Sequence, residues 1–189
     1  MKSNPRMLVL MSSVLISIVL FGCSKSEQTG IILEASIMPT YNGADTMSVD
    51  AVQSMCTSTI EYFASHGATV TFNARLKDPN STYQESLTVE RYTVTYTAHA
   101  DSPTAPVLQV DVRNDTILIP SPSGAEIVTV EASVMFVDLI RKGQYAAALI
   151  AGISNYTAAY TFEGRDQYDV PFTITTNADF EIGDFINCP

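Results

Sequence analysis

The residues of this sequence with the most direct chemical potential are its three cysteines, Cys23, Cys56 and Cys188. A thiol can be acylated, oxidised to a disulfide or used as a metal ligand, and its surroundings decide which of these occurs. Zinc is disfavoured at Cys56 and Cys188, because neither has a histidine or another cysteine at ligand spacing. Acylation and disulfide formation are therefore the expected reactions.

Cys23 ends a segment that has the three parts of a secretory signal. A short basic start leads into the uncharged, apolar stretch Met7–Phe21, and the small residue Gly22 stands directly before the cysteine. As a helix, this stretch would span roughly 22 Å, less than the roughly 30 Å hydrocarbon core of a bilayer. We therefore expect residues 1–22 to be a signal peptide rather than a permanent transmembrane anchor.

The four residues Leu20-Phe21-Gly22-Cys23 resemble the lipobox of bacterial lipoproteins. That motif places a branched apolar residue three positions before the cysteine and a small residue directly before it. The resemblance implies that the Cys23 thiol receives a diacylglyceryl group and that the chain is cut before Cys23. Phe21 departs from the motif, which prefers a smaller residue, so we expect slower processing. The alternative is an ordinary secretory peptide in which the cysteine occurs by chance.

An acylated Cys23 would hold the protein on a membrane, since each buried methylene contributes about 0.8 kcal/mol and several acyl chains act together. Ser24 stands where inner-membrane lipoproteins of many Gram-negative bacteria carry Asp, so the resemblance favours the outer membrane. Residues 23–30 are expected to form a polar tether. Residues 31–189 then have the size of one domain.

If Cys23 is acylated, Cys56 and Cys188 are left, and an exported protein meets an oxidising compartment. We therefore predict a disulfide between Cys56 and Cys188, with two free thiols as the alternative. The bond would close a loop of about 130 residues. The chain-entropy model assigns roughly 4–5 kcal/mol to such a closure.

The formal charge of the chain is −10, and loss of Lys2 and Arg6 with the signal peptide makes it about −12. This balance disfavours nucleic acid, whose binding depends on Lys and Arg contacts to phosphate. It also disfavours docking of the domain on anionic lipids. Solubility and mutual repulsion account for the charge, and a basic protein partner is the functional alternative.

The other candidates for chemistry are two histidines and a pair of loop aspartates. No H-x-x-x-H or C-x-x-C spacing supports a metal or catalytic role for His66 or His99. Walker, G-x-S-x-G, G-x-G-x-x-G and haem-attachment motifs are all missing, so we expect no enzyme activity and no cofactor. Asp166 and Asp169 are weak calcium candidates, although turn geometry explains loop aspartates equally well.

Alternation of apolar and polar residues with period two recurs in residues 31–189 and predicts β-strands. Ala68–Asp78 and Ser86–Ala98 are predicted to pair antiparallel, with a β-bulge near Glu90-Arg91. The residues Gly164–Asp169 are predicted to connect a hairpin.

Further along, Leu108, Val110 and Val112 are predicted to form an apolar face of one strand. The apolar spacing changes to three over Val134–Lys142, which predicts a helix broken at Gly143 and continued over residues 144–150. Seven or so strands with a short helical insert predict an all-β, immunoglobulin-like two-sheet sandwich. A lipocalin-like barrel is the alternative.

The tyrosines form two groups. Those at alternating strand positions are predicted to be buried or half-buried: Tyr92, Tyr96, Tyr156 and Tyr160. Those in predicted loops are the better candidates for ligand contact: Tyr41, Tyr83 and Tyr168.

Four segments together resemble envelope lipoproteins of environmental, metal-reducing bacteria: Glu61–Thr71, Leu87–Val94, Ala158–Asp166 and Glu181–Phe185. The resemblance implies a cell-envelope setting and no particular activity, so no site residue follows from it. The sequence therefore predicts a non-enzymatic, lipid-anchored envelope protein that binds or scaffolds a protein partner. The alternatives are a lipid or small-molecule carrier and an envelope hydrolase in which a histidine converges with Asp and Ser.

Overall fold

The computed structural model describes residues 30–41, 44–45, 47–54, 61–62, 64–82, 85–148 and 152–185. The predicted signal peptide, Cys23 and the tether up to residue 29 lie outside the described residues, as do Cys56, Cys188 and Tyr83. No helix in the described part of the chain is long and apolar enough to cross a membrane.

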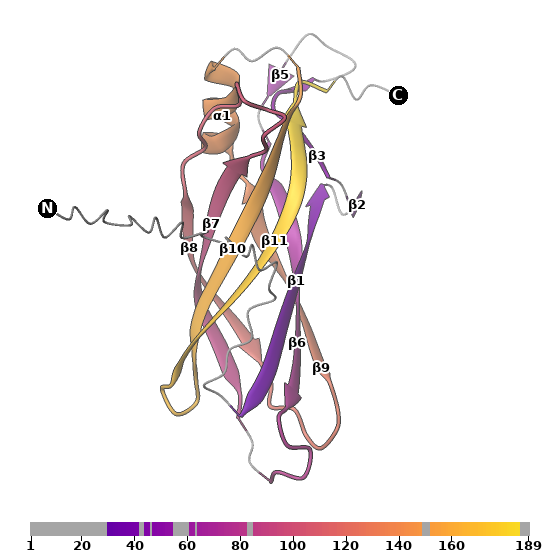
Figure 1. Ribbon diagram of the computed structural model, residues 1–189, viewed down its shortest axis with the longest axis vertical. Coiled ribbons are helices and arrows are strands. Elements are labelled where there is room, and N and C mark those ends of the chain that lie inside the picture. The colour runs from indigo at the N-terminus through magenta and orange to yellow at the C-terminus, as the bar shows by residue number, and fades with distance from the viewer. Residues whose placement is uncertain are drawn as a thin grey trace, which may run out of the picture.

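Most of the described chain folds into two β-sheets that pack face to face (Figure 1). The first sheet has the strand order β2 (Ala44–Asp45), β1 (Ile31–Tyr41), β6 (His66–Leu76) and β9 (Val128–Val137). The second has the order β3 (Ser48–Asp50), β11 (Pro171–Gly183), β10 (Ser154–Asp166), β7 (Leu87–Ala98) and β8 (Asp111–Ile119). The short strands β4 (Gln53–Ser54) and β5 (Glu61–Tyr62) pair with each other.

The long strands follow an immunoglobulin-like order. Of the seven long strands in the described chain, β1, β6 and β9 lie in one sheet, and β11, β10, β7 and β8 lie in the other. In this sandwich arrangement the fourth long strand, β8, lies beside the third, β7. The predicted two-sheet sandwich is confirmed. The lipocalin-like barrel is not the architecture, because no strand pairing joins the two sheets in the described residues.

The predicted pairing of Ala68–Asp78 with Ser86–Ala98 is wrong. β6 pairs with β1 and β9, whereas β7 pairs with β10 and β8 in the opposite sheet. Alternation identifies the buried face of a strand, and both strands bury that face against the same core. Alternation does not identify the neighbouring strand. In the sequence, the connection from β6 to β7, which crosses between the sheets, therefore looks the same as a hairpin.

The predicted β-bulge near Glu90-Arg91 is confirmed. Both side chains are exposed, and the register of β7 against β8 shifts between Val89 and Arg91. On β10, opposite the bulge, a Cβ at Gly164 would lie 2.0 Å from the carbonyl oxygen of Thr88. The bulge therefore requires glycine at this position.

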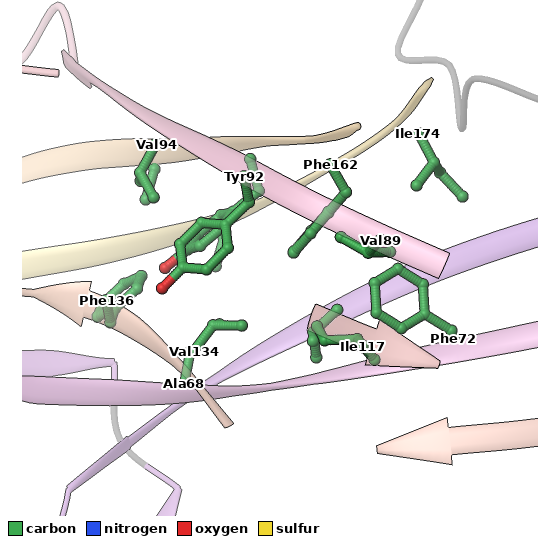
Figure 2. Close-up of a cluster of buried hydrophobic side chains, with 14 of the residues drawn as sticks. Ala68, Phe72, Val89, Tyr92, Val94, Ile117, Val134, Phe136, Phe162 and Ile174 are labelled. Carbon is green, nitrogen blue, oxygen red and sulfur yellow. The ribbon is translucent and has the colours of Figure 1, made fainter. Parts of the chain in front are cut away.

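Side chains from both sheets fill the space between them (Figure 2). The rings of Phe72 and Phe162 meet edge to face with 5.1 Å between centroids, and Phe136 meets Phe180 at 4.9 Å. Such pairs contribute about 0.5–1.5 kcal/mol beyond the burial of their area. The tyrosines predicted to be buried are buried: Tyr92, Tyr96, Tyr156 and Tyr160.

Helix α1 (Leu139–Ala147) starts later than predicted and continues through Gly143. Val134 and Val137 belong to the end of β9, where the register against β6 shifts and Phe136 has no partner in the ladder. The irregular strand end buries all three side chains. Its apolar spacing therefore resembled that of a helix.

Candidate functional site

The two aspartates predicted as weak calcium candidates do not converge on one point. Asp166 Oδ1 accepts the backbone N–H groups of Tyr168 and Val170, each at 2.8 Å, and so closes the predicted β10–β11 hairpin. The Asp169 side chain is 84% exposed, and its Oδ1 lies 3.3 Å from Arg165 Nη1. Within the described residues, no group of three or more His, Cys, Asp or Glu side chains is arranged to hold a metal.

The two histidines lie apart in the fold and make separate contacts. His66 begins β6 and is buried, and burial together with the charge of Lys142 lowers its pKa to about 4. His99 follows β7, and its Nε2 lies 2.9 Å from the Thr157 hydroxyl. That hydroxyl donates to Asp179 at 2.6 Å. The Thr157 hydroxyl therefore bridges His99 and Asp179.

Of the three tyrosines proposed for ligand contact, two fall in the described chain. Tyr168 is 55% exposed in the β10–β11 turn. Tyr41 is the last residue of β1 rather than part of a loop. Tyr168 does not line the groove described below.

The inward face of α1 is polar, which no apolar pattern could have predicted. Arg141, Lys142 and Tyr145 are buried, whereas Leu139 and Ile140 are 50% and 60% exposed. An amphipathic helix normally buries the opposite set. The helix is therefore held by polar contacts beneath it.

Two arginines and two aspartates form a network between α1 and β8. Arg141 Nη1 lies 2.7 Å from Asp138 Oδ2, and Arg141 Nη2 lies 3.5 Å from Asp111 Oδ1. Arg113 joins the same carboxylates, with Nε 2.9 Å from Asp111 and Nη2 2.8 Å from Asp138. Arg113 remains 38% exposed, while the other three side chains are buried. The network thus orients one half-exposed guanidinium at the start of β8.

A second contact joins α1 to β3. The Lys142 ammonium is fully buried and donates to the carbonyl oxygen of Asp50 at 2.5 Å. Burial lowers the pKa of Lys142 to about 8. Burial also raises the pKa of Asp50, whose carboxyl group accepts the N–H of Phe185. These contacts fasten the helix over the end of the sandwich (Figure 1).

A groove of about 440 Å³ separates β8 from β9. Its lining comes from β7, β8 and β9: Tyr92, Arg113, Asn114, Asp115, Ser133, Val134 and Met135. Tyr92 accepts the N–H of Met135 at 2.9 Å, and Tyr160 donates to the Met135 carbonyl oxygen at 2.8 Å. These bonds supply partners for the backbone of β9 near the point where its pairing with β6 becomes irregular. They also fix one wall of the groove.

The two edges beside this groove differ from those across the sandwich. The orders of the sheets end at β8 and β9, whereas β3 covers part of the β11 edge and β2 part of the β1 edge. We call this side, formed by β8, β9 and the groove, the open side. β8 contains neither Lys nor Pro, two residues that commonly protect free edges.

Three apolar side chains of β8 and its approach face solvent, beside the exposed polar residues Asn114, Asp115 and Thr116. Val110, Val112 and Leu118 are 48%, 55% and 60% exposed. The prediction that Leu108, Val110 and Val112 form one apolar face is therefore wrong, since only Leu108 is buried. The chain after Leu108 is held by α1, because Arg141 donates to the carbonyl oxygens of Gln109 and Val110, and this sets which residues face inward.

No protein-family model, curated protein or solved structure matches this chain. Its geometry defines an immunoglobulin-like sandwich with one open side and a polar, helix-capped end. Sequence reasoning missed Arg113, Arg141 and Lys142. The sequence signal that could have revealed them is Asp138, an N-cap residue directly after an apolar strand. A helix predicted to start after Asp138 would have had these polar residues on its inward face.

Proposed function

We propose that this chain is a cell-envelope lipoprotein, anchored through Cys23 at the outer membrane, whose sandwich binds another envelope protein without catalysing a reaction. The anchor is supported by the signal-peptide pattern and the lipobox resemblance of residues 20–23. The formal charge of −10 favours a protein partner over nucleic acid.

The observation that carries the binding role is the open side. A free edge strand offers unpaired N–H and C=O groups, to which an extended segment of a partner can add as a further strand. β8 offers such an edge, and Val112 and Leu118 supply apolar surface beside it. The proposed occupant is therefore an extended segment of an envelope protein, paired with β8.

Arg113 and Asp115 give this surface its polarity. Arg113 uses Nε and Nη2 in the network, and its Nη1 makes no hydrogen bond within the described chain. In the proposed complex, that atom donates to a carbonyl oxygen of the added segment. Asp115 is exposed in the same groove, so basic residues in the segment are favoured, as the charge of the whole chain also favours.

The test is to place a lysine on the edge, where it obstructs strand addition. Val112→Lys and Leu118→Lys are compared with Ile153→Lys, a matched control at a 54% exposed apolar residue away from β8. Proteins that co-purify from gently solubilised native membranes are quantified for each variant. We expect one partner to be recovered with the wild type and the control and to be lost with both β8 variants. Equal recovery with all four proteins would contradict the proposal.

A carrier of lipids or small molecules is less well supported. The space between the sheets is occupied by aromatic side chains such as Phe72 and Phe162. The groove between β8 and β9 lies at the surface and is partly polar. Carriers of apolar ligands use concave, mostly apolar pockets instead.

A further inference from the structure

Glu85 is a buried carboxyl group at the end of the sandwich opposite α1. It is 1% exposed, and its Oε2 accepts the N–H of Gly30 at 2.9 Å. Its own backbone N–H donates to the Ser121 hydroxyl at 2.8 Å. β1 begins beside it, and the β10–β11 turn lies at the same end (Figure 1).

The second oxygen of Glu85 has no hydrogen-bond donor. Oε1 is buried without one in the described chain. Asp166 lies beside this carboxyl group, because Asp166 pairs with Leu87 in the β7–β10 ladder and the next residue, Gln167, donates its N–H to the Ser86 carbonyl oxygen at 3.2 Å. Burial, and then the neighbouring Asp166, raise the pKa of Glu85. The pKa of Asp166 is lowered by the N–H groups of Val170 and Tyr168, although burial acts in the opposite direction.

Two carboxyl groups in contact need a positive charge between them, which a shared proton or a metal ion can supply. We propose that Glu85 Oε1 and the Asp166 carboxylate bind a calcium ion, with backbone carbonyl oxygens and water completing the shell. Hard oxygen ligands are those that Ca²⁺ prefers. Lys77 is the nearby cation, and it is exposed and has the smallest effect on Glu85.

The carboxyl groups are held in place before an ion arrives. Asp166 is fixed by two backbone N–H groups, and Glu85 is fixed by Gly30 and Ser121. Fixed ligands reduce the ordering cost of binding. With only two carboxylates, the expected dissociation constant is in the range of extracellular calcium modules, roughly 10⁻⁴–10⁻³ M. The ion would brace Gly30, where the predicted tether joins the sandwich, against the β10–β11 turn.

The first experiment measures thermal unfolding of the full chain at pH 7 after treatment with a chelator, with increasing CaCl₂. At about ten times the dissociation constant, we expect the midpoint to rise by about 3–5 °C. Glu85→Gln keeps an acceptor for Gly30 and should lose this response. Asp169→Asn, which alters the exposed aspartate paired with Arg165, should retain it.

A shared proton predicts the opposite pattern. Calcium would then leave the midpoint of the wild type unchanged, and stability would fall as the pH rises above the ordinary pKa of a glutamate, because the pKa of Glu85 is raised in the folded state. That result, with the pH dependence removed by Glu85→Gln, would overturn the proposal.

A second measurement does not depend on the folding of a Glu85 variant. The chain has no Trp, so terbium luminescence excited through tyrosine reports binding, and Tyr168 follows Asp166 closely. We expect one Tb³⁺ ion per chain, displaced by Ca²⁺, in the wild type and in Asp169→Asn. Absence of a saturable signal would also overturn the proposal.

Discussion

Arg113 and Asp111 meet through two contacts at the start of β8: the Nε atom of Arg113 lies 3.0 Å from Oδ1 and 2.9 Å from Oδ2 of Asp111. Asp138 contributes a third contact to the same guanidinium, at 2.8 Å from Nη2, and is also the N-cap residue of α1. Asp138, the residue that starts the helix, therefore also orients Arg113 in the groove.

Asp138→Ala should destabilise the protein strongly. Asp138 Oδ1 accepts the N–H groups of Ile140 and Arg141, and loss of an N-cap costs about 1 kcal/mol. Oδ2 pairs with the buried Arg141, and breaking a buried ion pair costs about 3–5 kcal/mol. We expect the free energy of unfolding in urea to fall by about 3–5 kcal/mol.

Asp115→Ala is the matched control for that experiment, since Asp115 is exposed and outside the network. Its free energy of unfolding should stay within about 0.5 kcal/mol of the wild type. Equal effects of the two substitutions would show that the network does not hold the helix.

Lys142 should make stability depend on pH in the alkaline range. Its pKa is about 8 in the folded protein and about 10.4 when unfolded, so the unfolded chain binds more protons between these values. The free energy of unfolding should therefore rise from pH 8 to pH 10, by on the order of 2–3 kcal/mol. Lys142→Met should flatten this rise. Parallel profiles for the two proteins, measured by denaturant unfolding, would contradict the assignment.

Two glycine substitutions should have opposite signs. Gly164→Ala places a Cβ against the backbone of Thr88, and we expect a loss of about 1–3 kcal/mol or more. Gly143→Ala lies within α1 with nothing within 4 Å of the new Cβ, so a gain of about 0.5–1 kcal/mol is expected. Thermal unfolding compares both with the wild type, and a neutral Gly164→Ala would mean that the bulge can move.

Much of the fold was predictable because burial in a sandwich alternates along each strand. Val70 and Phe72 face inward as their positions required, and the shift of phase at Glu90 marked the bulge. Strand neighbours were not predictable in the same way. The identity of a partner strand depends on contacts distant in sequence, which is why β6 and β7 were wrongly paired.

The candidate sites were harder to predict than the fold, because their side chains carry no pattern along the sequence. Arg141 and Lys142 face inward only because Asp138, Asp111 and the Asp50 carbonyl group receive them. Glu85 meets Asp166 across the end of the sandwich, a contact between residues far apart in the chain. Asp166 was singled out from its loop position, but its partner is Glu85 rather than Asp169.

The most direct test of the binding role is photo-crosslinking in the native membrane, with a photoreactive amino acid at Val112 on β8. The matched position is Thr173, an exposed residue of β11 in the same sheet. We expect Val112 to crosslink to one envelope protein through an extended segment of it, and Thr173 not to crosslink to that protein. Crosslinks to that protein from Thr173 but not from Val112 would contradict the proposed pairing with β8. So would the absence of crosslinks from Val112 while the complex remains intact.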